Sequence, residues 1–252
     1  MIGRRGANSI RSNLWKILFL QAMNWFLLIM PTLVLFFNEN GMTLSQVMIL
    51  QAIFSMSLIA FEVPSGYFSD VVGRRYTLVI STILNSVGLL FMSLSGTFMG
   101  FMIAELLLGM SASFVSGTDS ALLYDTLESL QRTEEYTKYQ GILSSISHFS
   151  ETLAAIMGGW LAALSLRLPL YVETVLVALT IPVSLMLIEP ERKPRNRRAG
   201  LADIIQIAKF ALAEHKVLKG FITYSSFIAS ATFTVVWLIQ PAVAEAGLPI
   251  YW

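Results

Sequence analysis

Long apolar runs alternate with short polar segments along the whole chain. Most runs have the roughly 20 residues that an α-helix needs to cross a hydrocarbon layer about 30 Å thick, and lipid tolerates no unpaired backbone. The pattern therefore predicts an all-α polytopic membrane protein. Its seven spans are expected at residues 14–37, 44–68, 76–94, 98–118, 139–163, 168–188 and 220–240.

The polar segment between the first two runs carries clear helix-boundary signals. Gly41 can end one helix, because glycine readily adopts the left-handed conformation found after helix ends. Thr43 and Gln46 have the spacing of a capping box for the next helix. These signals predict a tight hairpin between the first two spans.

Composition excludes a soluble globule, since 55% of the residues are hydrophobic and only 13% are charged. The absence of cysteine excludes disulfides and thiolate metal sites. Sixteen of the 17 lysines and arginines lie on alternate inter-span segments, with Arg167 the exception. Basic residues concentrate on the cytoplasmic side. The N-terminus is therefore expected to be cytoplasmic.

The segment between the sixth and seventh runs is the main break in organisation. A basic cluster at residues 192–198 precedes residues 201–216, whose apolar positions recur at helical spacing. Such a segment suits a cytoplasmic linker lying on anionic lipid. We expect a bundle at residues 1–190, this linker at 191–217, and a further membrane segment at 218–252.

A short polar decapeptide at residues 66–75 is the most specific motif in the chain. It reads Gly-Tyr-Phe-Ser-Asp-Val-Val-Gly-Arg-Arg and resembles the loop between the second and third helices of major facilitator superfamily transporters. The five positions that carry the resemblance are Gly66, Asp70, Gly73, Arg74 and Arg75. In these proteins, the aspartate latches onto the eleventh helix. The acids following the fourth run are alternative partners for the arginines within this chain: Asp119, Asp125, Glu128, Glu134 and Glu135.

The resemblance implies a six-helix bundle, the linker, helix seven and the approach to helix eight. The chain is accordingly expected to stop in mid-fold, as a truncated product or a fragment. Transporters of this family bind a solute between two bundles that rock to expose it alternately to each side. The first and fourth helices of each bundle line the pathway, which singles out polar residues of the first and seventh spans: Gln21, Asn24, Tyr224, Ser225 and Ser226.

Ionisable groups within apolar runs are candidates for proton or substrate coupling, because lipid disfavours them elsewhere. Glu62, Glu105, and the His148 and Glu151 pair are the candidates here, each with a structural alternative. Glu62 could snorkel towards water, and the pair could be a salt bridge within helix five. Glu173 lies near the outer end of the sixth span and is expected to be structural.

Glu105 stands four residues before Gly109, where the family often has arginine, so the charge is reversed. A carboxyl group in a low-dielectric setting could exchange protons with a gradient, and a hydrogen-bonded structural acid is the alternative. Drug-proton antiporters resembling this family carry Gly-Pro, two residues and Gly-Gly on helix five. Gly158 and Gly159 match the second pair, which indicates antiport. The alternative is close helix packing, which Ala155, Gly159 and Ala163 permit at four-residue spacing.

The sequence predicts no enzyme, no cofactor and no nucleic-acid partner. It has no phosphate-binding Gly-Lys-Ser loop, no metal-spaced histidines and no aromatic residues interleaved with the basic linker. The leading hypothesis is proton-coupled uptake or efflux of a small solute across a bacterial-type plasma membrane. Two alternatives stay open: a non-transporting membrane fragment acting as a scaffold or interfering partner, and a half-size carrier that self-associates.

Overall fold

The computed structural model describes residues 4–190 and 209–247, and these parts of the chain are helical with no strand. The predicted all-α fold class is confirmed. The chain divides into two compact units, one built from residues 1–191 and the other from residues 192–249. Each unit is described separately below.

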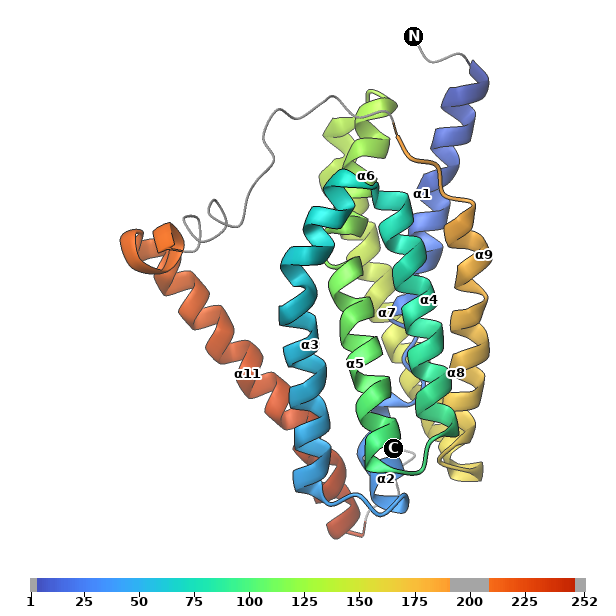
Figure 1. Ribbon diagram of the computed structural model, residues 1–252, viewed down its shortest axis with the longest axis vertical. Helices are drawn as coiled ribbons and strands as arrows, with labels where there is room; N and C mark the ends of the chain where they lie inside the picture. Colours follow the sequence, from blue (N-terminus) through green and yellow to red (C-terminus); the bar gives the residue numbers. More distant parts are fainter. Residues whose placement is uncertain (1–3, 191–208, 248–252) are drawn as a thin grey trace. The chain divides into compact units, whose positions relative to one another are not determined.

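The first unit is a bundle of long helices joined by short turns (Figure 1). Its elements are α1 (Arg4–Asn24), η1 (Met30–Thr32), α2 (Leu33–Glu39), α3 (Leu44–Val71), α4 (Arg74–Leu94), α5 (Phe98–Val115), α6 (Thr118–Ser129), η2 (Thr133–Glu135), α7 (Tyr136–Leu164), α8 (Leu168–Ala178) and α9 (Thr180–Leu185).

Five helical segments among the described residues are long and apolar enough to cross a membrane: residues 44–71, 74–94, 98–129, 168–185 and 216–243. They correspond to predicted spans two, three, four, six and seven. The first predicted span is interrupted. The fifth corresponds to α7, which is long but carries His148, Glu151 and several serines.

The predicted hairpin between the first two spans is present. Thr43 and Gln46 form the capping box at the start of α3: Thr43 Oγ1 accepts the Gln46 N–H at 3.3 Å, and Gln46 Oε1 accepts the Thr43 N–H at 2.9 Å. Gly41 has φ +79°. These local signals were readable because both partners lie within a few residues of each other.

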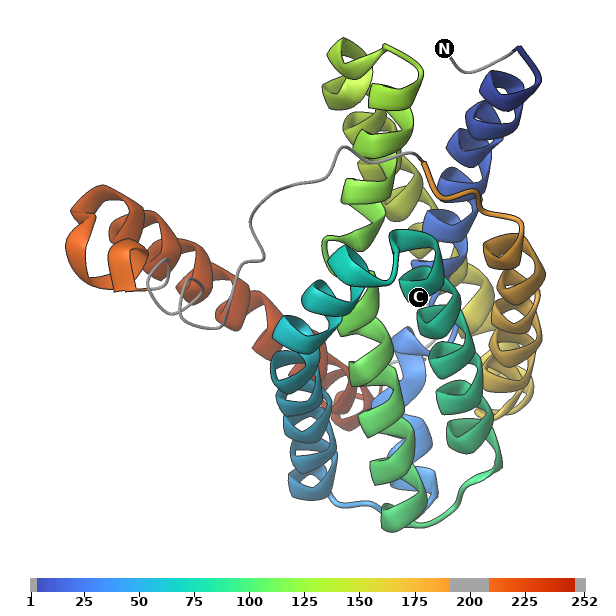
Figure 2. The same cartoon turned by 45° about the horizontal axis from the view of Figure 1, so that its top comes forward.

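Small residues let α3, α4 and α5 pack closely, and both views show the three helices side by side (Figures 1 and 2). A Cβ atom added to Gly109 of α5 would lie 2.5 Å from the Phe54 carbonyl oxygen of α3. Ser57 and Ser65 of α3 donate hydrogen bonds to the carbonyl oxygens of Leu106 and Ser113, at 2.9 and 2.8 Å. Close backbone contact and interhelical hydrogen bonds hold helices together where lipid removes the hydrophobic driving force.

The prediction of one continuous helix at residues 14–37 is wrong. Helix α1 ends at Asn24, residues 25–29 are not helical, and α2 begins only at Leu33. Pro31 lies in the short 3-10 turn between the halves, where its missing N–H removes one helical hydrogen bond. Helix one is therefore two half-helices joined by a non-helical segment.

Helix α7 packs directly against this joint. A Cβ atom on Gly158 would lie 1.9 Å from the carbonyl oxygen of Leu28, which is fully buried. The sequence pattern indicated close packing at Ala155, Gly159 and Ala163, whereas the contact recorded here is at Gly158 and is with the non-helical backbone of Leu28. Gly158 is needed because no side chain fits between the two segments.

The second unit contains a π-helical turn, Phe210–Glu214, followed by α11 (Lys216–Glu245), which includes the predicted seventh span. The basic cluster and the first half of the predicted amphipathic segment lie outside the described residues. The predicted linker boundaries and surface helix therefore stay predictions.

Substituting Gly158 with alanine should destabilise the bundle. We expect Gly158→Ala to lower the free energy of unfolding by about 1–3 kcal/mol, the usual penalty for overpacking, although alanine is the better helix former. The measurement is thermal unfolding in detergent. Gly141→Ala is the matched control on the same helix, since its Cβ would meet nothing within 4 Å. Equal effects of both substitutions would contradict the close contact at Leu28.

Candidate functional site

The turn between α3 and α4 holds the glycine and arginines of the decapeptide. Gly73 adopts φ +133° and ψ 145°, which L side chains rarely adopt. A Cβ atom there would also lie 3.1 Å from Glu189 Oε2. Gly66, by contrast, lies inside α3, and a Cβ on it would meet nothing within 4 Å. Helix α3 continues beyond the predicted end of the second span at residue 68, to Val71.

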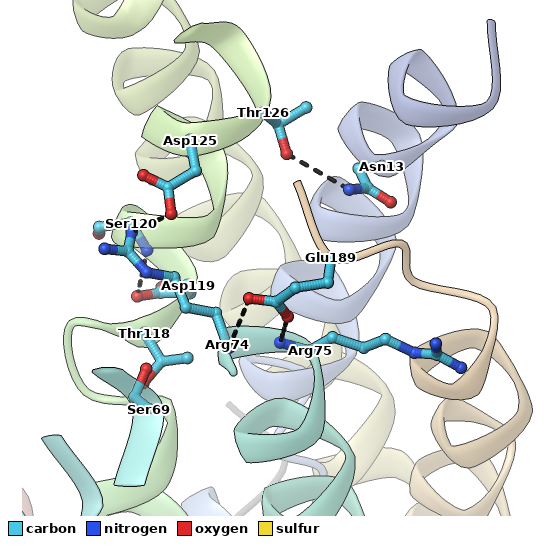
Figure 3. Close-up of polar contacts among 10 residues, drawn as sticks. All are labelled: Asn13, Ser69, Arg74, Arg75, Thr118, Asp119, Ser120, Asp125, Thr126 and Glu189. Atoms are coloured by element: carbon cyan, nitrogen blue, oxygen red, sulfur yellow. Dashed lines mark hydrogen bonds and ion pairs between the residues drawn. The ribbon is translucent and has the colours of Figure 1, made fainter. Parts of the chain in front are cut away.

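The first N–H groups of α4 donate hydrogen bonds to the carboxylate of Glu189 (Figure 3). Glu189 Oε1 accepts the Arg74 N–H at 3.1 Å and Oε2 accepts the Arg75 N–H at 2.7 Å. The first N–H groups of a helix have no intrahelical partner and favour negative charge. Asp70 of the motif lies in the last turn of α3, where it is exposed.

Both arginine side chains of the motif reach other helices. Arg74 Nη1 lies 3.0 Å from Asp125 Oδ2 of α6, and each side chain is only 13% exposed. Arg75 Nη2 donates to the carbonyl oxygen of Leu185, the last residue of α9, at 2.8 Å. The Asp125 contact is one of the ion pairs that the acids after the fourth run made possible.

Helix α1 binds the same end of the sixth span. Asn13 Nδ2 donates to the Ile188 carbonyl at 2.7 Å, while its Oδ1 accepts the Ile188 N–H at 3.0 Å. Lys16 Nζ donates to the Met186 carbonyl at 2.5 Å. Residues 185–189 are thus held by α1 and α4 together. The sequence analysis overlooked Asn13 and Glu189, although polar side chains at the edge of apolar runs were an available signal.

The candidate coupling acids lie in different surroundings. Glu105 is 3% exposed, and its Oε1 accepts a hydrogen bond from Gln51 Nε2 of α3 at 3.1 Å. Glu62 is exposed, and its Oε1 accepts from the Ser116 hydroxyl at 2.7 Å. Only the first of these carboxyl groups is enclosed by the bundle.

His148 and Glu151 do share one face of α7, as their spacing predicted. His148 Nδ1 lies 3.8 Å from Glu151 Oε2, and the side chains are 76% and 48% exposed. The pair therefore lies on the surface of this unit and does not meet Glu105 in its interior.

Gln21 and Asn24 of α1 line a partly open cavity of about 40 Å³, together with Ser81, Thr82, Asn85 and Asp119 among others. Gln21 Nε2 also donates to Ser147 Oγ at 2.8 Å. A cavity of this size holds a few water molecules, whereas pockets for drug-sized ligands measure roughly 300–1,000 Å³. It is not by itself a solute site.

Tyr224, Ser225 and Ser226 are exposed on α11, within the second unit. They are expected to line a pathway, and this stays a prediction. Among the residues that the structure describes, no group of three or more His, Cys, Asp or Glu side chains could hold a metal ion.

Glu173 of α8 is more than a peripheral acid. It is 2% exposed, and its Oε2 accepts the backbone N–H of Ile29 at 3.0 Å. The sequence analysis treated Glu173 as structural without identifying a partner. A lone acid in an apolar run was the available signal.

Removing the Glu189 carboxylate should loosen the start of α4. We expect Glu189→Ala to lower the free energy of unfolding by about 1 kcal/mol, as for a lost helix N-cap. Thermal unfolding at fixed detergent concentration measures this change. Glu134→Ala, an exposed acid in the turn before α7, is the control and should be close to neutral. A Glu189→Ala protein as stable as the control would contradict the capping role.

Comparison with known proteins agrees with this architecture. Residues 14–251 match the family described as Major Facilitator Superfamily. Relatives include the quinolone resistance protein NorA of Staphylococcus aureus, which is 28% identical over 66% of this chain and 42% of its own length. An uncharacterized MFS-type transporter of Methanocaldococcus jannaschii is 22% identical over 81% of this chain and 51% of its own length.

The chain thus spans about half the length of the curated relatives that it matches. The family match, in contrast, covers nearly the whole chain, including the decapeptide, the broken helix one and α11. On this match, the chain belongs to the major facilitator superfamily and is a multi-pass membrane protein.

Proposed function

We propose that this chain supplies the N-terminal six-helix bundle, the cytoplasmic linker and the seventh helix of a secondary transporter. It works by alternating access and exports a small solute. Efflux is favoured over uptake because NorA is named for quinolone resistance. In this proposal the bundle lies in a bacterial-type plasma membrane with its N-terminus in the cytoplasm, as the distribution of lysine and arginine favours.

The observation that carries the proposal is the bracing of one end of the bundle. The loop of the decapeptide is held to α6 through Arg74 and Asp125, and to the end of the sixth span through Glu189. Alternating access requires a bundle that rocks largely as a rigid body. Ties between the second, third, fourth and sixth spans at one membrane face suit that requirement.

Glu105 is our leading candidate for proton coupling. Its carboxyl group is buried between α3 and α5, and its recorded hydrogen bond comes from the neutral amide of Gln51. No cation forms an ion pair with it among the described residues. A buried acid without a counter-charge is suited to binding and releasing a proton.

The other candidates take secondary roles. The exposed His148 and Glu151 pair could relay protons or bind a cationic solute on the face of α7. Glu62 could do the same from α3. Gln21 and Asn24, with Tyr224, Ser225 and Ser226, would contribute polar contacts to the pathway.

Replacing Glu105 should abolish proton-driven transport. The assay follows a fluorescent quinolone, the solute class in the relative's name, in inverted membrane vesicles with an imposed pH gradient. We expect gradient-dependent accumulation by the parent chain, and a loss of about ten-fold or more in Glu105→Gln, which cannot titrate. Glu134→Gln is the control and should transport normally.

Two results would favour the alternatives. Correct membrane insertion without gradient-driven flux of the quinolone or a cationic dye would contradict the transport proposal and favour a non-transporting partner. Flux that falls more steeply than in proportion when Glu105→Gln chains are mixed with parent chains would indicate a self-associating carrier.

A further inference from the structure

The joint in helix one leaves backbone groups without helical partners inside the bundle. Most recorded N–H groups of this stretch have local acceptors: Trp25 donates to Gln21, Met30 to Leu27 and Thr32 to Ile29. The N–H group of Ile29 instead donates to the carboxylate of Glu173. One side chain from a different helix thus satisfies the centre of the joint.

The site is enclosed on the other side as well. Leu28 is fully buried, Ile29 is 6% exposed and Glu173 is 2% exposed. Gly158 of α7 lies against the Leu28 carbonyl with no room for a side chain. In such surroundings an unsatisfied N–H would cost free energy, since no water replaces the lost partner.

The two halves of helix one are anchored independently at opposite ends of the unit. Helix α1 is held through Asn13 and Lys16 to residues 186–188. Helix α2 is held at its far end, where Arg167 Nη2 donates to Asn40 Oδ1 at 2.5 Å and to the Ser95 carbonyl at 2.9 Å.

Aromatic packing reinforces the α2 anchor. The rings of Phe36 and Phe37 lie 5.6 and 5.0 Å from the ring of Phe101 in α5. Two anchored rods that share a non-helical joint can change their angle only at that joint.

We propose that the joint at residues 25–32 is a hinge in helix one, and that Glu173 is the positioning residue that sets its angle by accepting the Ile29 N–H group. Glu173 acts through backbone geometry and touches no solute. It thereby fixes where Gln21 and Asn24, on the α1 side of the hinge, stand relative to α2. This inference concerns the bundle itself and does not depend on the proposed transport activity.

The test measures the angle between the two half-helices directly. The chain has no cysteine, so spin labels can be attached at Trp15→Cys on α1 and Glu39→Cys on α2, both exposed positions. A continuous helix would separate these two positions by about 36 Å. Pulsed electron-spin resonance on the full chain in lipid nanodiscs gives the distance distribution. The parent should give one population centred below the continuous-helix value.

Two substitutions at position 173 separate the acceptor from the side chain's bulk. Glu173→Ala removes both acceptors, and we expect the distance distribution to shift and broaden. Glu173→Gln keeps one carbonyl acceptor, so its distribution should remain closer to the parent's than that of the alanine variant. An unchanged distribution in Glu173→Ala would overturn the proposal, as would a glutamine variant that moves as far as the alanine variant.

A matched control distinguishes positioning from general destabilisation. Leu170 lies on the same helix and is fully buried, so Leu170→Ala should lower the melting temperature by leaving a cavity while leaving the distance distribution unchanged. If Leu170→Ala shifts the distribution as much as Glu173→Ala does, Glu173 has no special role and the proposal fails.

Solute flux is a separate readout. A parent protein without flux whose hinge still responds to Glu173→Ala would contradict the proposed function and leave the hinge intact. Normal flux with no hinge response would do the reverse.

Discussion

A backbone N–H that leaves a helix inside a membrane must find its acceptor within the protein, because lipid offers none. Helix one meets this constraint through Glu173, which reaches from α8 to the N–H group of Ile29. The same joint requires Gly158, since only a glycine lets α7 approach the Leu28 carbonyl. The interruption of helix one therefore requires an acid at position 173 of α8 and a glycine at position 158 of α7.

The rest of the bundle is arranged around fixed ends. At the end that carries the decapeptide, Glu189 caps α4 and Arg74 pairs with Asp125. Asn13 hydrogen-bonds to the backbone of Ile188 at the same end. At the other end, Arg167 joins three loops through carbonyl and amide oxygens, including those of Ser93, Ser95 and Asn40. Between them, α3, α4 and α5 are held by small residues and serine hydroxyls. Between these fixed ends, the joint in helix one is the place where we propose that the helix changes its angle.

Much of this fold follows from the sequence. Apolar runs located most helices, and the capping box at Thr43 was readable because its partners are three residues apart. Gly73 was singled out by the motif, and its positive φ explains why glycine is needed there. The pairing of Arg74 with one of the acids after the fourth span was also within reach, since few acids lie at that face.

What sequence reasoning missed depends on contacts between distant segments. The break in helix one was hidden because its residues are as apolar as a continuous span, and Pro31 alone does not say whether a helix kinks or stops. Glu189 hydrogen-bonds to the start of α4 although the two segments lie more than 100 residues apart in the sequence. Spacing placed His148 and Glu151 on one face but could not say that this face is exposed.

The joint of helix one depends most on Glu173 as the acceptor of the Ile29 N–H. Amide hydrogen exchange of Ile29, measured by NMR on the protein in nanodiscs, is the most direct test. We predict protection at this amide in the parent chain, and selective loss of that protection when Glu173 is replaced by alanine while α3 and α5 stay protected. Fast exchange at Ile29 in the parent chain, or undiminished protection without the carboxylate, would refute this role.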